Sequence, residues 1–98
     1  MKKIYISGKI TGDTNYRAKF FEEANRLLSL GYEPVNPAAL VLTDVSWEDA
    51  MKIALKAMLL CDGVSLLPCW KESKGAIIEE RLARELRMDV RDCEHWPF

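Results

Sequence analysis

The sequence predicts an α/β fold: a three-layer sandwich in which a parallel sheet of four to five strands lies between helices. Two observations lead to this prediction. Short apolar runs typical of buried strands recur along the chain, and longer segments with helical spacing separate them. The resulting order is βαβαβαβ, in which each helix is long enough to connect two parallel strands. With 98 residues, the chain suits a single domain over 1–98.

Four segments have the composition of strands. Residues 3–7 are β-branched and aromatic, and Gly8 ends the run in a tight turn. Residues 32–37 form a brief second strand whose prolines make it irregular or place it near an edge. Residues 64–68 and about 88–91 complete the set. A parallel sheet with this alternation is of the flavodoxin-like or Rossmann-like type.

Three segments have helical spacing. The first covers 15–30, with a cap at Thr14 or Asn15 and a stop at Gly31. Its expected inward positions are Ala18, Phe21, Ala24 and Leu28. The second opens at a Ser46 cap and runs through Leu60, and its expected inward positions are Met51, Leu55, Met58 and Leu59. The third begins at Ser73.

The third helix carries an acid on its apolar side. At about 100° per residue, Glu79 falls within the stripe formed by Ala76, Leu82, Ala83 and Leu86. Burying a carboxylate is costly unless a partner stabilises it. Two structural explanations are open: an arginine or backbone donor pairs with Glu79, or Glu79 faces solvent at the edge of the stripe. The third explanation is a functional site.

Two loops follow strands and therefore meet at the same edge of the predicted sheet. Residues 8–13 follow the first strand and residues 70–79 follow the third. Ligands of open α/β sheets bind at this edge, so we expect the two loops to face one crevice. The first loop offers GxxxG, which matches neither the dinucleotide fingerprint GxGxxG nor a phosphate-binding P-loop.

Composition excludes several classes of function. The net charge of -1 gives no basic surface for a nucleic acid polymer, and no apolar run approaches the length of a membrane span. We expect a cytoplasmic protein with no membrane partner. The three cysteines, Cys61, Cys69 and Cys93, fit no zinc spacing, which predicts free thiols and no metal site.

Two motifs together resemble those of a known family. Residues 4–12 read Ile-Tyr-Ile-Ser-Gly-Lys-Ile-Thr-Gly, Asp62 precedes a strand, and Ser73-x-Gly75-x-x-x-Glu79 opens a helix. In this combination the chain resembles the nucleoside 2-deoxyribosyltransferase-like superfamily. It is most similar there to 2'-deoxynucleoside 5'-monophosphate N-glycosidases and to short bacterial and phage proteins.

The resemblance implies a function and a set of site residues. The implied reaction is cleavage of an N-glycosidic bond in a deoxynucleoside 5'-monophosphate, by hydrolysis or transfer, without metal or organic cofactor. Glu79 would be the nucleophile and Tyr5 its orienting donor, with the pair as catalytic residues. The resemblance also implies that Gly8, Ser73 and Gly75 bind the substrate, and the further candidates of the two loops and strand ends are Ser7, Lys9, Asp13, Asp62 and Trp70. The family also pairs its subunits, which implies a homodimer or a higher homo-oligomer.

Several of these residues have simpler interpretations. Ser73 is a good helix N-cap, and Lys9 suits a solvated loop. Asp62 can fix the entry to its strand. Trp70, like Trp47, can either stack on a base or cover the core or a subunit contact.

One position departs from the resemblance and leaves other functions open. Ala54 stands where the family's enzymes have an aspartate that helps protonate the leaving base. Asp44, Glu48 and Asp49 are alternative acids, and the sequence does not choose among them. A nucleotide-binding module or sensor without turnover, or an accessory protein, is therefore the second hypothesis. An α/β interaction protein is the third, favoured if Trp70 or the C-terminal tail fills the crevice.

Overall fold

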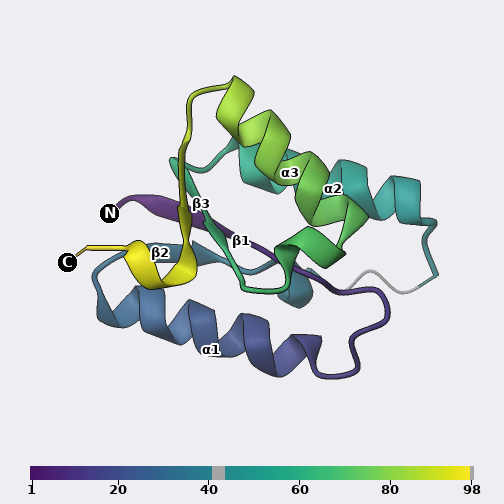
Figure 1. Cartoon of the computed structure of the whole chain (residues 1–98), viewed down its shortest axis with the longest axis horizontal. Helices are drawn as coiled ribbons and strands as arrows, with labels where there is room; N and C mark the ends of the chain where they lie inside the picture. The colour runs from purple at the N-terminus through teal and green to yellow at the C-terminus, as the bar shows by residue number, and fades with distance from the viewer. Residues whose placement is uncertain (41–43, 98) are drawn as a thin grey trace.

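A computed structural model describes residues 1–40 and 44–97 and confirms the α/β prediction. Four parallel strands form one sheet in the order β2-β1-β3-β4 (Figure 1). Their bounds are Lys3–Ser7 (β1), Glu33–Val35 (β2), Gly63–Leu66 (β3) and Asp89–Asp92 (β4). Adjacent β1 and β3 connect onward in opposite directions across the sheet, so the edge beyond their carboxyl ends is a topological switch point.

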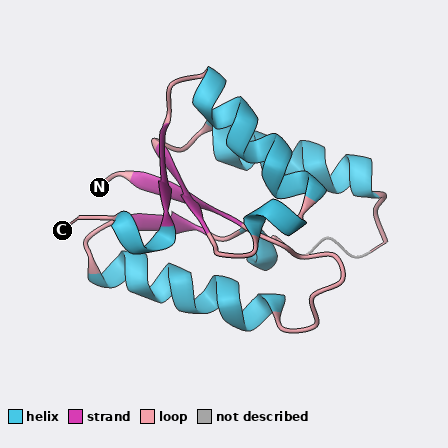
Figure 2. Ribbon diagram, viewed as in Figure 1, coloured by secondary structure: helices cyan, strands magenta, loops and turns pink. Residues whose placement is uncertain are grey.

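Helices cover both faces of the sheet. Helix α1 (Tyr16–Ser29) lies on one face, and α2 (Trp47–Leu59) and α3 (Lys74–Glu85) lie together on the other (Figures 1 and 2). Three short 3-10 turns, Pro37–Ala39 (η1), Trp70–Glu72 (η2) and Cys93–His95 (η3), follow strands β2, β3 and β4. The predicted three-layer sandwich is therefore present, with four strands in the described part of the chain.

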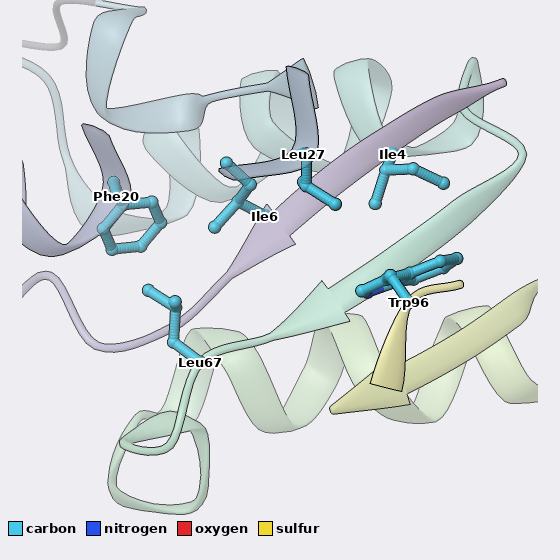
Figure 3. Packing of buried hydrophobic residues seen from close by; sticks show 6 residues of the cluster. All are labelled: Ile4, Ile6, Phe20, Leu27, Leu67 and Trp96. Atoms are coloured by element: carbon cyan, nitrogen blue, oxygen red, sulfur yellow. The ribbon is translucent and has the colours of Figure 1, made fainter. Parts of the chain in front are cut away.

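Alternation along β1 divides the core in two. Ile4 and Ile6 point toward α1, where they pack with Phe20, Leu27, Leu67 and Trp96 (Figure 3). Tyr5, between them, belongs to the second cluster under α2 and α3, together with Ala54, Met58, Val64, Leu66 and Ala83. Because successive side chains of a strand point to opposite faces, one five-residue strand supplies both cores.

The inward face predicted for α1 is wrong by one residue. Phe20 and Leu27 are fully buried, whereas Phe21 is 63% exposed and Leu28 is 53% exposed. The cause is a second buried acid, Glu23, on the inward face. Its carboxylate accepts a hydrogen bond from Ser65 at 2.7 Å and pairs with the Arg26 guanidinium at 2.9 Å. A charged residue inside the stripe made the neighbouring stripe the more apolar of the two.

The other predicted faces are correct in part. In α2, Met58 is buried and Leu55 packs against the second core, but Leu59 is 50% exposed. In α3, Ala76 and Ala83 are buried, whereas Leu86 is 53% exposed. Leu86 is the C-cap residue, where the chain leaves the helix and the helical spacing no longer fixes the direction of the side chain.

Gly63 marks the closest packing within the sheet. A Cβ atom at this position would lie 2.6 Å from the Asp89 carbonyl oxygen and 2.9 Å from the Trp96 ring. We expect Gly63→Ala to lower the free energy of unfolding by about 3 kcal/mol, because backbone and a buried ring must both move. Urea unfolding measures this loss.

Gly31 offers a matched control for that substitution. Its φ is +92°, and a Cβ there would have no neighbour within 4 Å. Gly31→Ala is expected to cost only about 1 kcal/mol, the penalty of the left-handed backbone conformation. Equal losses in the two variants would contradict the packing explanation for Gly63.

Candidate functional site

A cavity of about 380 Å³ opens at the carboxyl edge of the sheet, beside the switch point. Its walls come from the end of β1 and the loop after it, η1, and the N-terminal parts of the three helices. They include Tyr5, Gly8, Trp47, Ser73, Gly75 and Glu79. The loops after β1 and β3 therefore meet at one crevice, as the sequence predicts.

Glu79 is buried in this cavity and held by two hydroxyl groups. Its side chain comes from the inward face of α3, and the residue is 5% exposed. Tyr5 donates a hydrogen bond to Oε2 at 2.5 Å, and Ser7 donates one to Oε1 at 2.7 Å. Both donors point from the same face of β1, because they are two residues apart. The predicted Tyr5 contact is confirmed, and the alternative of an arginine or backbone partner is not what the structure shows.

Burial shifts the pKa values of both Glu79 and Tyr5. Loss of solvation raises the pKa of Glu79 from 4.5 to about 7, although the hydrogen bonds from Tyr5 and Ser7 favour the ionised form and act in the opposite direction. Burial, and then the charge of Glu79, raises the pKa of Tyr5 well above its ordinary value. Tyr5 therefore stays a protonated donor, while Glu79 changes charge near neutral pH.

Helix α3 begins at the cavity. Ser73 is its N-cap, and the Ser73 hydroxyl accepts a hydrogen bond from the Ala76 N–H at 3.1 Å. The simpler interpretation of Ser73 is thus correct, and the residue also lines the cavity. Gly75 is required by close packing, since a Cβ there would lie 2.9 Å from the Met51 sulfur. The remaining N–H groups of this first turn suit an anion.

Gly8 lies where β1 turns into the cavity loop. It is buried, and a Cβ there would lie 2.8 Å from the Leu67 side chain. Its backbone can therefore pass close to β3 and line the cavity, as the sequence predicts.

Lys9 and Asp13, from the same loop, are outside the cavity lining. The Lys9 N–H donates to the Cys69 sulfur, and the Lys9 ammonium lies 3.7 Å from Glu72. Asp13 pairs with Lys19 at 2.7 Å and accepts the Asn15 N–H, and these hydrogen bonds lower the pKa of Asp13. Both side chains serve to shape the loop in this structure.

The structure corrects two further predicted contacts. Asp62 lies at the opposite edge of the sheet, before β3, where its carboxylate accepts the Lys3 N–H at 2.8 Å. Trp70 packs against the second core, with the Lys71 ammonium 5.7 Å from its ring centre. Neither residue lines the cavity, because Asp62 stands at the amino end of its strand and the Trp70 side chain packs against the second core.

Two cavity residues with polar side chains, Tyr16 and Arg17 at the start of α1, were missed by the sequence analysis. Trp47, for which the sequence left base stacking open, lines the cavity at the start of α2, with the Lys74 ammonium 4.3 Å from its ring centre. The available signal was their position, since helices that follow strands begin at the carboxyl edge of a parallel sheet.

The acids of the cavity are few. Among the described residues that line it, Glu79 is the only carboxylate, and Ala54 forms part of the wall. Asp44, Glu48 and Asp49 are exposed and stand outside this lining. The structure thus brings none of the three alternative acids into the wall.

Other chemistry can be assessed over residues 1–40 and 44–97. No group of His, Cys, Asp and Glu in these ranges is arranged to hold a metal ion, and the three cysteines are free thiols. None of the helices in the same ranges has the length and apolar composition to cross a membrane.

Comparison with known proteins places the chain in a family. A search of curated proteins found no match. A family model described as "Domain of unknown function (DUF4406)" matches residues 2–92, which include every strand and helix that builds the cavity. The chain therefore belongs to the DUF4406 family.

Proposed function

We propose that this protein cleaves the N-glycosidic bond of a deoxynucleoside 5'-monophosphate or a related nucleotide, by hydrolysis or deoxyribosyl transfer. The observation that carries the proposal is the Glu79 carboxylate, buried in an open cavity with both oxygens held by Tyr5 and Ser7. The resemblance of its motifs to those of the nucleoside 2-deoxyribosyltransferase-like superfamily supports the same function.

The reaction uses Glu79 as a nucleophile. Breaking the bond between the sugar C1' and the base builds positive charge on the sugar, and a carboxylate beside C1' stabilises this charge. Glu79 then bonds to C1' as an ester, which water or a second base opens. Tyr5 and Ser7 fix the direction of the carboxylate, so little reorientation precedes attack.

The start of α3 is the proposed phosphate site. Ser73, Gly75 and Ala76 line the cavity, and the N-terminus of the helix favours an anion. The Ala76 N–H already donates to the Ser73 hydroxyl, so the phosphate would meet the other N–H groups of the first turn. Six residues separate Ser73 from Glu79, about 9 Å along the helix axis. This is close to the reach from a 5'-phosphate to C1', so one helix holds both ends of the sugar.

The assembly and location follow from the same proposal. Exposed apolar side chains on the three helices and at their C-caps support a homo-oligomer: Phe21, Leu28, Ile53, Leu60, Ile77 and Leu86. The partner molecules are a small nucleotide and further copies of the chain, without a nucleic acid polymer or membrane. The proposed compartment is the cytoplasm, and the proposed chemistry uses no cofactor.

Base release tests the function directly. The purified protein is incubated with each deoxynucleoside 5'-monophosphate, and the free base is separated by chromatography. Addition of a second free base distinguishes hydrolysis from transfer, because transfer yields a new nucleotide. Absence of any released base from every nucleotide contradicts the proposal.

A nucleotide-binding module is the second candidate. The observation that favours it is Ala54 in a cavity wall whose described lining has one carboxylate, because a neutral base leaves slowly without a proton donor. Calorimetric binding of nucleotides without base release supports the module. The interaction-protein hypothesis loses its support, since neither Trp70 nor the described tail lines the cavity.

Ser73→Ala tests the phosphate site. The variant is expected to lose about 1 kcal/mol of stability as the cap of α3 disappears. It should also raise KM for the monophosphate about tenfold, because a hydrogen bond to a charged group is lost. KM for the nucleoside without phosphate should stay unchanged. A parallel rise for both substrates would place the phosphate elsewhere.

A further inference from the structure

The cavity has a nucleophile but lacks a second acid within its described lining. Glu79 is the one carboxylate there, and both of its oxygens accept hydrogen bonds, from Tyr5 at 2.5 Å and Ser7 at 2.7 Å. To attack C1' as the nucleophile Glu79 must be ionised, and in that form it has no proton to give to the leaving base. The other polar groups of the described wall are the hydroxyls of Thr11, Tyr16, Ser46 and Ser73, the indole N–H of Trp47 and the guanidinium of Arg17.

Because the described lining offers no second carboxylic acid as a proton donor, the rate of cleavage should depend on the charge of the substrate's base. A neutral purine or pyrimidine leaves as an anion unless an acid protonates it, and such protonation commonly contributes about 10² to 10⁴ in rate. A base that is already a cation while bonded to the sugar leaves as a neutral molecule. Departure of that base needs no proton donor.

We propose that the preferred substrate is a nucleotide whose base is a cation, such as an N7-alkylated purine or a pyridinium nucleotide. This inference rests on the proposed function and names its substrate class. The juxtaposition that carries it is a buried, doubly hydrogen-bonded Glu79 in a cavity whose Ala54 wall offers only a methyl group.

The rest of the cavity suits a flat cation. Phe20 and Trp47 give the wall aromatic rings, and Met51 gives it a polarisable sulfur. The charge of Glu79 attracts a cationic base. The positive charge of Arg17, on the first turn of α1, suits the phosphate of the same substrate.

The reaction balances with water as the only co-reactant. The electron pair of the C1'–N bond moves onto the ring nitrogen and neutralises the base, while a Glu79 oxygen bonds to C1'. Water then attacks C1', the ester bond returns its electron pair to the Glu79 carboxylate, and the extra proton of the water passes to solvent. The products are a neutral base, the sugar phosphate and one proton.

A matched pair of substrates tests the inference. N7-methyl-2'-deoxyguanosine 5'-monophosphate and 2'-deoxyguanosine 5'-monophosphate differ by one methyl group and one charge. Base release from each is measured with the wild-type protein and with Glu79→Gln, which supplies the spontaneous rate. We expect kcat/KM for the methylated nucleotide to be at least about 100-fold higher. For each nucleotide we divide the rate of the wild-type protein by the rate of Glu79→Gln. This quotient should be at least as large for the methylated nucleotide as for the neutral one.

The outcomes separate this inference from the proposed function. If the ratio of wild-type to variant rate is tenfold greater for the neutral nucleotide, a proton donor acts on guanine. The inference is then overturned, while the glycosidase function stands. If neither nucleotide is cleaved faster by the wild-type protein than by the variant, the glycosidase function itself fails, and the inference fails with it.

Discussion

Replacement of Glu79 by glutamine is expected to lower base release by on the order of 10⁴-fold, because an amide neither stabilises the cationic sugar nor forms the ester with C1'. The fold should persist, since the amide oxygen can accept from Tyr5 or Ser7 and the shape of the side chain is kept. Single-turnover release of free base, followed by chromatography, measures the loss. Circular dichroism checks the fold.

The next residue supplies the control. Glu80 is adjacent in the chain but pairs with Arg84 on the surface side of α3. Glu80→Gln makes the same chemical change outside the cavity and should keep the wild-type rate. If both variants release base equally well, Glu79 is not the nucleophile.

The same Glu79→Gln variant is expected to be more stable than the wild-type protein at pH 8, by about 3 kcal/mol. The reason is the shifted pKa of Glu79, which rises from 4.5 to about 7 because the carboxylate is buried. Each pKa unit corresponds to about 1.4 kcal/mol between folded and unfolded states. Glutamine has no charge to bury and avoids this cost.

The sign of the pH dependence follows from the two pKa values. Below pH 4.5 Glu79 is protonated in both states, and its contribution to stability is fully present. Between pH 4.5 and about 7 only the unfolded state loses the proton, so the wild-type free energy of unfolding falls. Above pH 7 the contribution stays lost.

Urea unfolding at pH 4 and at pH 8 measures the free energy of unfolding on either side of this pH range. The stability difference between Glu79→Gln and wild type should be small at pH 4 and reach its full value at pH 8. Glu80→Gln, measured in parallel, should show no such gain at pH 8. A Glu79→Gln variant that is less stable than wild type at pH 8 would mean that the hydrogen bonds from Tyr5 and Ser7 outweigh the cost of burial.

Much of the fold could be predicted because local patterns and tertiary structure agree. Strands β1 and β3 are short apolar runs ended by turns, and the predicted N-caps at Ser46 and Ser73 are present. The cap predicted for α1 is correct in position only, because Asn15 makes no side-chain cap hydrogen bond. Helix α1 shows the limit. Of two neighbouring stripes on it, the less apolar one packs on the sheet, because Ser65 and Arg26 stabilise its Glu23. Ser65 is 42 residues away from Glu23 in the sequence, so the spacing of apolar residues within α1 does not reveal this contact.

The site could be predicted where strand and helix geometry determine it. Glu79 belongs to a stripe, and Tyr5 and Ser7 alternate on one strand, so their meeting follows from regular spacing. Lys9, Asp13 and Trp70 lie in irregular segments, where side-chain direction depends on the path of the loop. Helical spacing says nothing about that path, which explains why these predicted contacts are not found in the cavity.

Strand β1 links the geometry of the cavity to the register of the sheet. A slip of β1 by a single residue would turn Ile4 and Ile6 toward Glu79 and send Tyr5 and Ser7 among the apolar side chains of α1. In that register the buried Glu79 carboxylate would lose its two hydrogen-bond donors, and the Tyr5 and Ser7 hydroxyls would lose their acceptor. The register of β1 that buries Ile4 and Ile6 is therefore the same register that brings Tyr5 and Ser7 to Glu79.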